Sequence, residues 1–392
     1  MRIINANVIS DGLTHPDMCV VIDDKIIKDL IPMNQITKQS DQTTLDIKGN
    51  MLCAGFIDIH THGCAMFDTM DASEKSFDEI AHFHFQNGET TFLPTTLTAS
   101  LGSIAKVFDC FRRFKTTFPV SLPGIHLEGP FLSAVNRGAQ PERFLLTPDR
   151  DSIDFVVKNS DVIRLITVAP DLPNIKPLIE ACVENGIVVS GGHDDAIETE
   201  VYEAMLSGLR SVTHIFCSSS TLSRRNLERH IGITEVALSS DALYAEAIAD
   251  GAHLPYALFN LLYKCKSYER IVIVSDSIRA TGMPKGNYYV GESNEGIRVE
   301  VTDKVAMLAD KSKYAGSITP VRKMVEGLRR NTDIPLAKIV YMATTSPASL
   351  LHFKKTGDVR KGYEAKLNVL SPEGVLLRTI VNDTVFERAS RE

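Results

Sequence analysis

Eight short apolar runs, separated by segments of helical character, fill the middle of this 392-residue chain and constrain its fold most strongly. The runs are residues 56–62, 90–96, 123–128, 163–169, 187–193, 211–216, 244–250 and 270–276. Segments such as SFDEIAHFHFQNG and IKPLIEACVENG lie between them and end on a glycine, as helices often do. Strands that alternate with helices in this way predict an α/β fold, a (β/α)8 TIM barrel.

The two ends of the chain have a different pattern. Residues 1–53 contain short strand-like segments and turns, without strong helical periodicity. Residues 362–392 return to strand-like segments around a Pro-Glu-Gly turn. Because each end alone is too short for a good core, we expect the two ends to form one small β-domain, with residues 54–361 as the barrel domain.

Charge and cysteine content exclude several classes of protein. A formal net charge of −7 gives no electrostatic argument for binding nucleic acid or an anionic membrane. The seven cysteines are scattered and form no CxxC pair, which argues against a disulfide framework or a cysteine zinc site. The start, MRIINANVIS, lacks the pattern of a signal peptide, and no apolar run approaches a membrane span. We expect a cytoplasmic protein in a reducing compartment.

The first apolar run carries an unusual set of polar residues in the stretch GFIDIHTHG, residues 55–63. Side chains two positions apart on a strand point to the same face, so Asp58, His60 and His62 share one face. Three polar groups on one face of an apolar strand need polar partners or a metal.

Ionisable side chains recur at the predicted strand ends, where the active sites of barrel enzymes form. These residues are His60, His62, Glu128, His193, His214, His253 and Asp276. A single histidine at such a position is more often structural, but independent structural histidines have no reason to gather at one rim. The recurrence predicts a shared site.

The donor types in this set indicate a metal-dependent hydrolase. Four imidazoles and a carboxylate suit Zn²⁺, with Fe²⁺, Mn²⁺ or Co²⁺ as alternatives. Such a metal lowers the pKa of bound water from ~15.7 toward ~7. Asp276 is placed to take the proton of that water and pass it to the leaving group. The alternative role for Asp276 is that of an N-cap for a following helix.

Seven motifs occur in order over nearly the whole chain: GFIDIHTHG, HLEGPF, GGHDDA, THIF, DGAH, SDSIRATGMP and AGS. Together they resemble the N-acetylglucosamine-6-phosphate deacetylase family of the amidohydrolase superfamily. The resemblance implies a metal-dependent barrel with a small β-sandwich built from both chain ends, usually as a homodimer. It also implies hydrolysis of the acetamido group of a small-molecule amino-sugar phosphate, which releases acetate and the free amine.

The resemblance further implies one or two divalent metals per chain. Glu128, His193 and His214 would hold one metal. His60 and His62, together with Glu128, would hold a second metal in members that have two.

Catalytic and substrate-binding roles follow from the same resemblance. Asp276 would act as general base and then as general acid, and His253 would polarise the acyl carbonyl. Arg225 would bind the sugar phosphate. The implied substrate-binding positions are Ala139, Gln140, Cys217, Ser218, Arg225, His253, Ala315, Gly316 and Ser317.

The chain departs from the family pattern in its substrate loops. Gln140 stands where the family usually has histidine, and Cys217 with Ser218 stands where it usually has Asn-Ala. Two interpretations remain open, drift within one specificity or a changed N-acyl substrate. An amidohydrolase acting on another amide or cyclic amide, and a metal-free barrel that only binds or scaffolds, are the other hypotheses.

Two further histidines, His82 and His84, lie two positions apart on a predicted helix. Because that spacing does not share a helix face, we assign them no function. His126 precedes Glu128 by two positions, and we expect it to support the site rather than to bind a metal.

Overall fold

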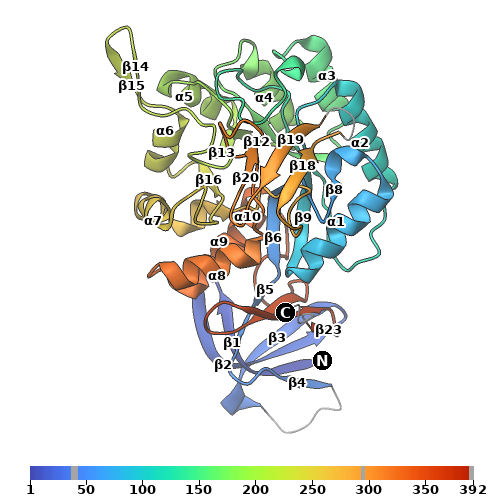
Figure 1. Ribbon diagram of the computed structural model, residues 1–392. Coiled ribbons are helices and arrows are strands. Elements are labelled where there is room, and N and C mark those ends of the chain that lie inside the picture. Colours follow the sequence, from blue (N-terminus) through green and yellow to red (C-terminus); the bar gives the residue numbers. More distant parts are fainter. Residues whose placement is uncertain (37–42, 293–295, 388–392) are drawn as a thin grey trace.

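The computed structural model describes residues 1–36, 43–292 and 296–387, with a barrel above a sheet made from both chain ends (Figure 1). Eight parallel strands form the barrel, each hydrogen-bonded to the next. They are β6 (Phe56–Thr61), β9 (Glu89–Thr96), β10 (Ile125–Glu128), β11 (Ile163–Val168), β12 (Val188–Gly191), β13 (Leu209–Val212), β16 (Tyr244–Ala247) and β17 (Ile271–Ile273). A parallel bridge between Thr61 and Ser277 joins the ends of the first and last strands. The predicted TIM barrel is therefore confirmed.

Each of the eight predicted runs contains part of an observed strand. The poorest match is the sixth, because β13 covers Leu209–Val212 whereas the run was expected over 211–216. His214 therefore lies in the turn just past the end of the strand.

Helices cover the outside of the barrel (Figure 1). They are α1 (Glu74–Gln86), α2 (Leu101–Arg113), α3 (Arg150–Lys158), α4 (Ile175–Glu184), α5 (Glu198–Ser207), α6 (Ile233–Ser239), α7 (Tyr256–Cys265), α8 (Val321–Asn331), α9 (Leu336–Met342) and α10 (Thr345–Leu350). α1 shows how the sequence sets such a helix: the Ser73 hydroxyl caps it by accepting from the backbone N–H of Ser76. Phe77, Ile80 and Ala81 recur at helical spacing and are buried against the barrel.

The chain ends combine as expected. Their strands are β1 (Arg2–Ser10), β2 (Leu13–Asp23), β3 (Ile26–Pro32), β4 (Thr44–Asp46), β5 (Met51–Ala54), β21 (Lys366–Leu370), β22 (Leu376–Val381) and β23 (Thr384–Glu387). The sheet order is β23-β22-β21-β5-β1-β2-β3, with β4 paired to β1. This sheet has its own apolar core, which includes Ile3, Leu52 and Leu367. The domain limits at 53/54 and 361/362 stay a prediction.

A small antiparallel sheet after the last barrel strand was not expected from the sequence. It consists of β18 (Gly286–Val290), β19 (Ile297–Val301) and β20 (Ala306–Leu308), and Figure 1 shows it in front of the barrel strands. A two-stranded hairpin, β14 (Ser223–Arg225) with β15 (Glu228–His230), projects at the upper left of the same view. Short β7 (Gly63–Cys64) and β8 (Phe67–Asp68), with 3-10 turns at Met33–Gln35, Thr69–Asp71, Glu142–Phe144 and Tyr268–Arg270, complete the described elements.

Among the helices in the described part of the chain, none combines the length and the apolar character that crossing a bilayer requires.

Candidate metal centre and active site

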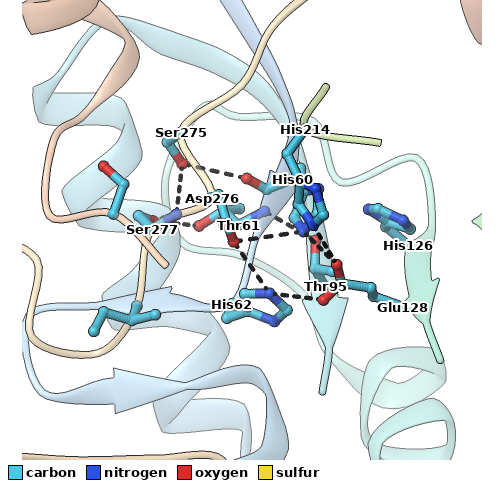
Figure 2. A network of polar contacts seen from close by, with 12 residues as sticks. His60, Thr61, His62, Thr95, His126, Glu128, His214, Ser275, Asp276 and Ser277 are labelled. Atoms are coloured by element: carbon cyan, nitrogen blue, oxygen red, sulfur yellow. Dashed lines mark hydrogen bonds and ion pairs between the residues drawn. The ribbon is translucent and has the colours of Figure 1, made fainter. Parts of the chain in front are cut away.

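The structure brings most of the predicted site residues together at the carboxyl ends of the barrel strands. Figure 2 shows His60, His62, Glu128, His214 and Asp276 pointing toward one another. These side chains come from strands far apart in the sequence, so only the closed barrel can assemble them.

Glu128, the last residue of β10, is the common neighbour of four imidazoles. Its Oε1 lies 3.1 Å from Nε2 of His214 and 3.2 Å from Nε2 of His193. Oε1 also lies 3.5 Å from Nε2 of His60, and Oε2 lies 3.2 Å from Nε2 of His62. The Glu128 side chain is almost fully buried, so this carboxylate depends on these nitrogens rather than on water for its stabilisation.

Asp276, which follows β17, faces the two histidines of the first strand. Its Oδ1 lies 3.3 Å from Nε2 of His62 and 3.5 Å from Nε2 of His60. His60, His62 and Asp276 have ligand atoms within 4.8 Å of one another, and so do His60, Glu128 and His214. The two groups share His60, so they form one continuous cluster.

Hydrogen bonds at Nδ1 of His193 and His60 influence which tautomer each ring adopts, and therefore whether Nε2 is available to a metal. Nδ1 of His193 lies 3.0 Å from the backbone carbonyl of Asn136, and because a carbonyl only accepts, Nδ1 carries the proton. Nδ1 of His60 lies 3.2 Å from Oε2 of the buried Glu246, which favours the same tautomer. In the neutral form of each ring, Nε2 then presents a lone pair to the centre of the cluster.

This donor set fits a divalent metal ion. Nε2 of His60 is buried and has no hydrogen-bond partner among the described residues. Nε2 of His193 and Nε2 of His214 lie 3.1 Å apart. Two ring nitrogens lie this close only when a proton or a cation lies between them. Neutral imidazoles and a carboxylate are the ligands expected for zinc and related transition metals.

Backbone strain marks the same positions. His193, His214 and Asp276 have φ values of 48°, 29° and 45°, in the left-handed region that residues with a side chain seldom adopt. Each lies just past the end of its strand. Strained backbone at three strand ends around one cluster is typical of a functional site.

The surroundings of Asp276 keep it ionised. Burial alone would raise its pKa, but the neighbouring His60 and His62 outweigh burial and hold the pKa below its usual value. Burial would likewise raise the pKa of Glu128, and the imidazoles of His60, His193 and His214 hold it well below its usual value. Asp276 is thus a carboxylate that can accept a proton.

A cavity of about 390 Å³ opens over this cluster. Glu128, His193, His214 and Asp276 lie in its floor and wall, together with the apolar side chains of Val290, Ile297 and Val299 from the small antiparallel sheet. Seven of the positions assigned to substrate binding also line it: Ala139, Gln140, Cys217, Ser218, His253, Ala315 and Gly316. The cavity is large enough for a small organic substrate.

Comparison with known proteins agrees with this geometry. Residues 51–387 match the model of the Amidohydrolase family. The chain belongs to the amidohydrolase family.

Two relatives of this amidohydrolase carry names for deacetylases of sugar phosphates. It is 33% identical over 339 residues to the N-acetylglucosamine-6-phosphate deacetylase of Lysinibacillus sphaericus, which covers 86% of this chain and 85% of the relative. This chain is also 29% identical over 304 residues to the N-acetylgalactosamine-6-phosphate deacetylase of Escherichia coli O157:H7, and the match covers 77% of this chain and 78% of the relative.

A solved structure shares the whole architecture of this amidohydrolase. The crystal structure of N-acetylglucosamine-6-phosphate deacetylase from Pasteurella multocida aligns with a TM-score of 0.90 and 26% identity. The alignment covers 98% of this chain and 99% of that chain. The barrel with an attached sheet of end strands is therefore the fold of a hydrolase family.

His253 lies on the cavity wall of the amidohydrolase and is held on two sides. Its Nδ1 lies 2.8 Å from Oδ2 of Asp250, and its backbone N–H donates to the other oxygen of the same carboxylate at 2.8 Å. The ring of Tyr314 contacts the His253 ring, with 4.9 Å between centroids. These contacts leave Nε2 of His253 for a substrate.

Two expected substrate residues lie outside the cavity lining. Arg225 is in β14, where its guanidinium donates to the backbone carbonyl of Asp195 and pairs with the Asp195 carboxylate at 3.1 Å. Ser317 is fully buried, and its backbone N–H donates to the backbone carbonyl of Asp276 at 2.7 Å. Ser317 thus fixes Asp276, whereas the role of Arg225 on a phosphate stays a prediction.

Cys217 lines the cavity, and its surroundings disfavour the thiolate form. Burial, followed by the charges of Asp276 and Asp250, raises the pKa of its thiol to about 12. The thiol is therefore protonated at neutral pH, and the thiolate is the form that attacks.

Sequence analysis missed three residues that hold the site: Asn136, Glu246 and Asp250. Glu246 carried a weak signal, because it is a lone acidic residue in the apolar strand YAEA. Asp250 is the first residue of the DGAH motif, but the motif gave it no role, and Asn136 lies in a loop. No motif pointed to Asn136.

A second buried network lies on the other face of β6. The Thr61 hydroxyl bonds the Ser277 hydroxyl at 2.7 Å and lies 3.1 Å from Nε2 of His84. Nδ1 of His84 pairs with Glu89, and both side chains are buried. His126 is also buried, between the backbone carbonyl of Ile59 and the Thr167 hydroxyl.

Proposed function

We propose that this amidohydrolase removes the acetyl group from an N-acetylated amino-sugar phosphate, N-acetylglucosamine 6-phosphate or a close relative. The observation that carries the proposal is the meeting of four imidazoles with Glu128 and Asp276 under a cavity of substrate size. Both curated relatives described above are named as deacetylases of phosphorylated N-acetylhexosamines.

The metal assignment follows from the donor set. Glu128, His193 and His214 would hold one ion, and His60 and His62 with Glu128 would hold a second. Zinc is our first assignment, with iron, manganese or cobalt as alternatives. When bound, the ion supplies Lewis-acid chemistry, which polarises an acyl oxygen and lowers the pKa of water.

Asp276 and His253 have different roles in the proposed reaction. Asp276, as a buried carboxylate, accepts a proton from the attacking water and later donates it to the departing nitrogen. His253 donates from Nε2 to the acyl oxygen, which requires a ring protonated on both nitrogens while Asp250 accepts from Nδ1. The backbone hydrogen bond from Ser317 to the Asp276 carbonyl holds the main chain of Asp276 in place between these steps.

A second candidate is the hydrolysis of a different small N-acyl or cyclic amide by the same machinery. Cys217 and Ser218 on the cavity wall favour it, because they replace the amide-bearing pair that the family usually has at these positions. A homodimer and a cytoplasmic location also belong to our proposal, in line with the family resemblance.

A substrate panel tests the proposal. Purified protein with measured metal content is incubated with N-acetylglucosamine 6-phosphate, N-acetylgalactosamine 6-phosphate, unphosphorylated N-acetylglucosamine and a cyclic amide, and the release of acetate or free amine is followed. We expect turnover of at least one phosphorylated N-acetylhexosamine. Full activity after stringent demetallation, or turnover of the cyclic amide alone, would contradict the proposal.

A further inference from the structure

Away from the proposed metal site, the side chains that line the cavity carry little positive charge. Apart from its histidines, the charged residues that line the cavity are Glu128, Asp276 and one lysine, Lys313. A phosphorylated substrate adds further negative charge. Since burying an anion without a cationic partner is costly, a site for such a substrate needs a cation in its wall.

Lys313 is the cation that the described part of the chain provides there. Its ammonium group makes no ion pair or hydrogen bond among the described residues. Other basic side chains nearby are already paired. Lys311, in the same loop, lies 3.4 Å from Glu300, and Arg279 lies 2.9 Å from Asp71.

The backbone around Lys313 is fixed with respect to the catalytic residues. Its carbonyl accepts from the N–H of Leu308 at 3.0 Å, and the next residue, Tyr314, contacts the ring of His253. Four residues further on, Ser317 is bonded to the backbone of Asp276 at 2.7 Å. Four residues span at most about 14 Å, so the backbone of Lys313 lies within that distance of Ser317 and its contact with Asp276.

We propose that Lys313 binds the phosphate, or an equivalent anionic group, of the substrate of this amidohydrolase. This inference rests on the proposed function and deepens it, because it assigns the recognition of the anion to a residue of the cavity wall. It also differs from the family expectation for Arg225, whose guanidinium is engaged by Asp195.

Steady-state kinetics of three variants test the assignment. In Lys313→Met we expect KM for the phosphorylated N-acetylhexosamine to rise about 10- to 100-fold, the worth of one hydrogen bond to a charged group, with kcat within about 3-fold of wild type. Lys313→Arg keeps the charge and should stay within about 5-fold of wild type. Lys311→Met, in the same loop, is the matched control and should leave KM unchanged.

A second measurement does not depend on turnover. Inorganic phosphate should bind the metal-loaded wild-type protein in calorimetry, and Lys313→Met should weaken that binding by a similar factor. An unchanged phosphate affinity and KM in Lys313→Met would overturn the inference. If Lys313→Met is unaffected but Arg225→Met binds phosphate much more weakly, Arg225 is the residue that binds the anion.

The experiment separates this inference from the proposed function. Wild-type protein that releases no acetate from any phosphorylated N-acetylhexosamine contradicts the proposed function, and the phosphate titration then decides on Lys313 alone. Wild-type turnover with an unaffected Lys313→Met variant contradicts only the inference. KM for unphosphorylated N-acetylglucosamine should be the same in wild type and in Lys313→Met. If KM rises equally for the phosphorylated and the unphosphorylated sugar, the substitution has distorted the loop in general, and the inference about Lys313 is contradicted.

Discussion

Gln140 donates a hydrogen bond of 2.7 Å from its side-chain amide to Oε2 of Glu128. At the other end of the same amide, Oε1 accepts from the backbone N–H of Thr98 at 2.8 Å. The side chain is 3% exposed, so both ends are committed to the protein. Gln140 lies in the cavity wall as its assignment to substrate binding requires, but its contacts make it a support for the central carboxylate.

Gln140→Ala should therefore weaken metal binding more than substrate binding. Without the amide, Glu128 loses an orienting donor and the Thr98 N–H loses its partner. We expect metal affinity to fall about 10- to 100-fold, the usual effect of removing a residue that orients a ligand. Competition with a chelator measures this, and Gln86→Ala on the exposed surface of α1 is the control. Unchanged affinity with a raised KM would assign Gln140 to the substrate.

Asp276→Asn removes the proton acceptor and leaves the shape of the side chain. We expect the fold to persist and kcat to fall by about 10²- to 10⁴-fold, the range of general acid–base catalysis. The measurement is kcat in parallel with circular dichroism and metal content. An Asn variant with nearly wild-type kcat and full metal content would give Asp276 a purely structural role.

Glu246 should control the ion held by His60. Glu246→Ala leaves Nδ1 of His60 without its 3.2 Å partner and frees the ring to adopt the other tautomer. Elemental analysis should show less metal per chain, whereas Glu246→Gln keeps an acceptor and should restore most of it. Equal metal content in wild type and Glu246→Ala would show that His60 needs no partner to bind.

His84 and His82 provide a matched pair for stability. His84 is buried and pairs with the buried Glu89, so His84→Ala leaves an unpaired carboxylate in the interior. We expect a loss of about 3–5 kcal/mol in the free energy of unfolding. His82 bonds Gln86 and stacks on Phe118 near the surface, and His82→Ala should cost no more than ~1 kcal/mol. Urea unfolding compares the two variants, and similar losses would show that the buried pair contributes little.

The barrel could be predicted because its strands bury both faces and are therefore continuous apolar runs. The histidine and carboxylate positions followed from the rule that barrel sites form at strand ends. The short strands of mixed polarity in the small antiparallel sheet, such as GNYYV in β18, gave no comparable signal. Their contribution to the cavity wall therefore appeared only in three dimensions.

Side-chain contacts between residues far apart in the sequence could not be predicted either. Glu246 meets His60 across 186 positions of sequence, and Gln140 meets Glu128 through a loop whose path no periodicity specifies. His84 was assigned no function because it does not share a helix face with His82. That spacing argument is correct, since the two rings have different surroundings, but it cannot show that His84 points at Glu89.

The substrate loop supplies the last prediction. Cys217 lines the cavity, and a protonated thiol is only a weak hydrogen-bond donor, whereas an asparagine amide both donates and accepts. One missing contact of ~1–3 kcal/mol would lower kcat/KM for a 6-phosphosugar by about 5- to 150-fold. We therefore expect N-acetylglucosamine 6-phosphate to be a mediocre substrate of the wild type. Cys217→Asn combined with Ser218→Ala should raise kcat/KM for it.

Gln140 is left unchanged in this variant, because a histidine there would lose at least one of the bonds to Glu128 and Thr98 and confound the result. Ser219→Ala, next to the exchanged pair, is the control. A wild-type kcat/KM already near ~10⁵ M⁻¹s⁻¹, well inside the range of dedicated enzymes, would show that Cys217 and Ser218 are neutral drift. In that case the double variant should gain nothing, and the specificity of the cavity would depend on its other walls.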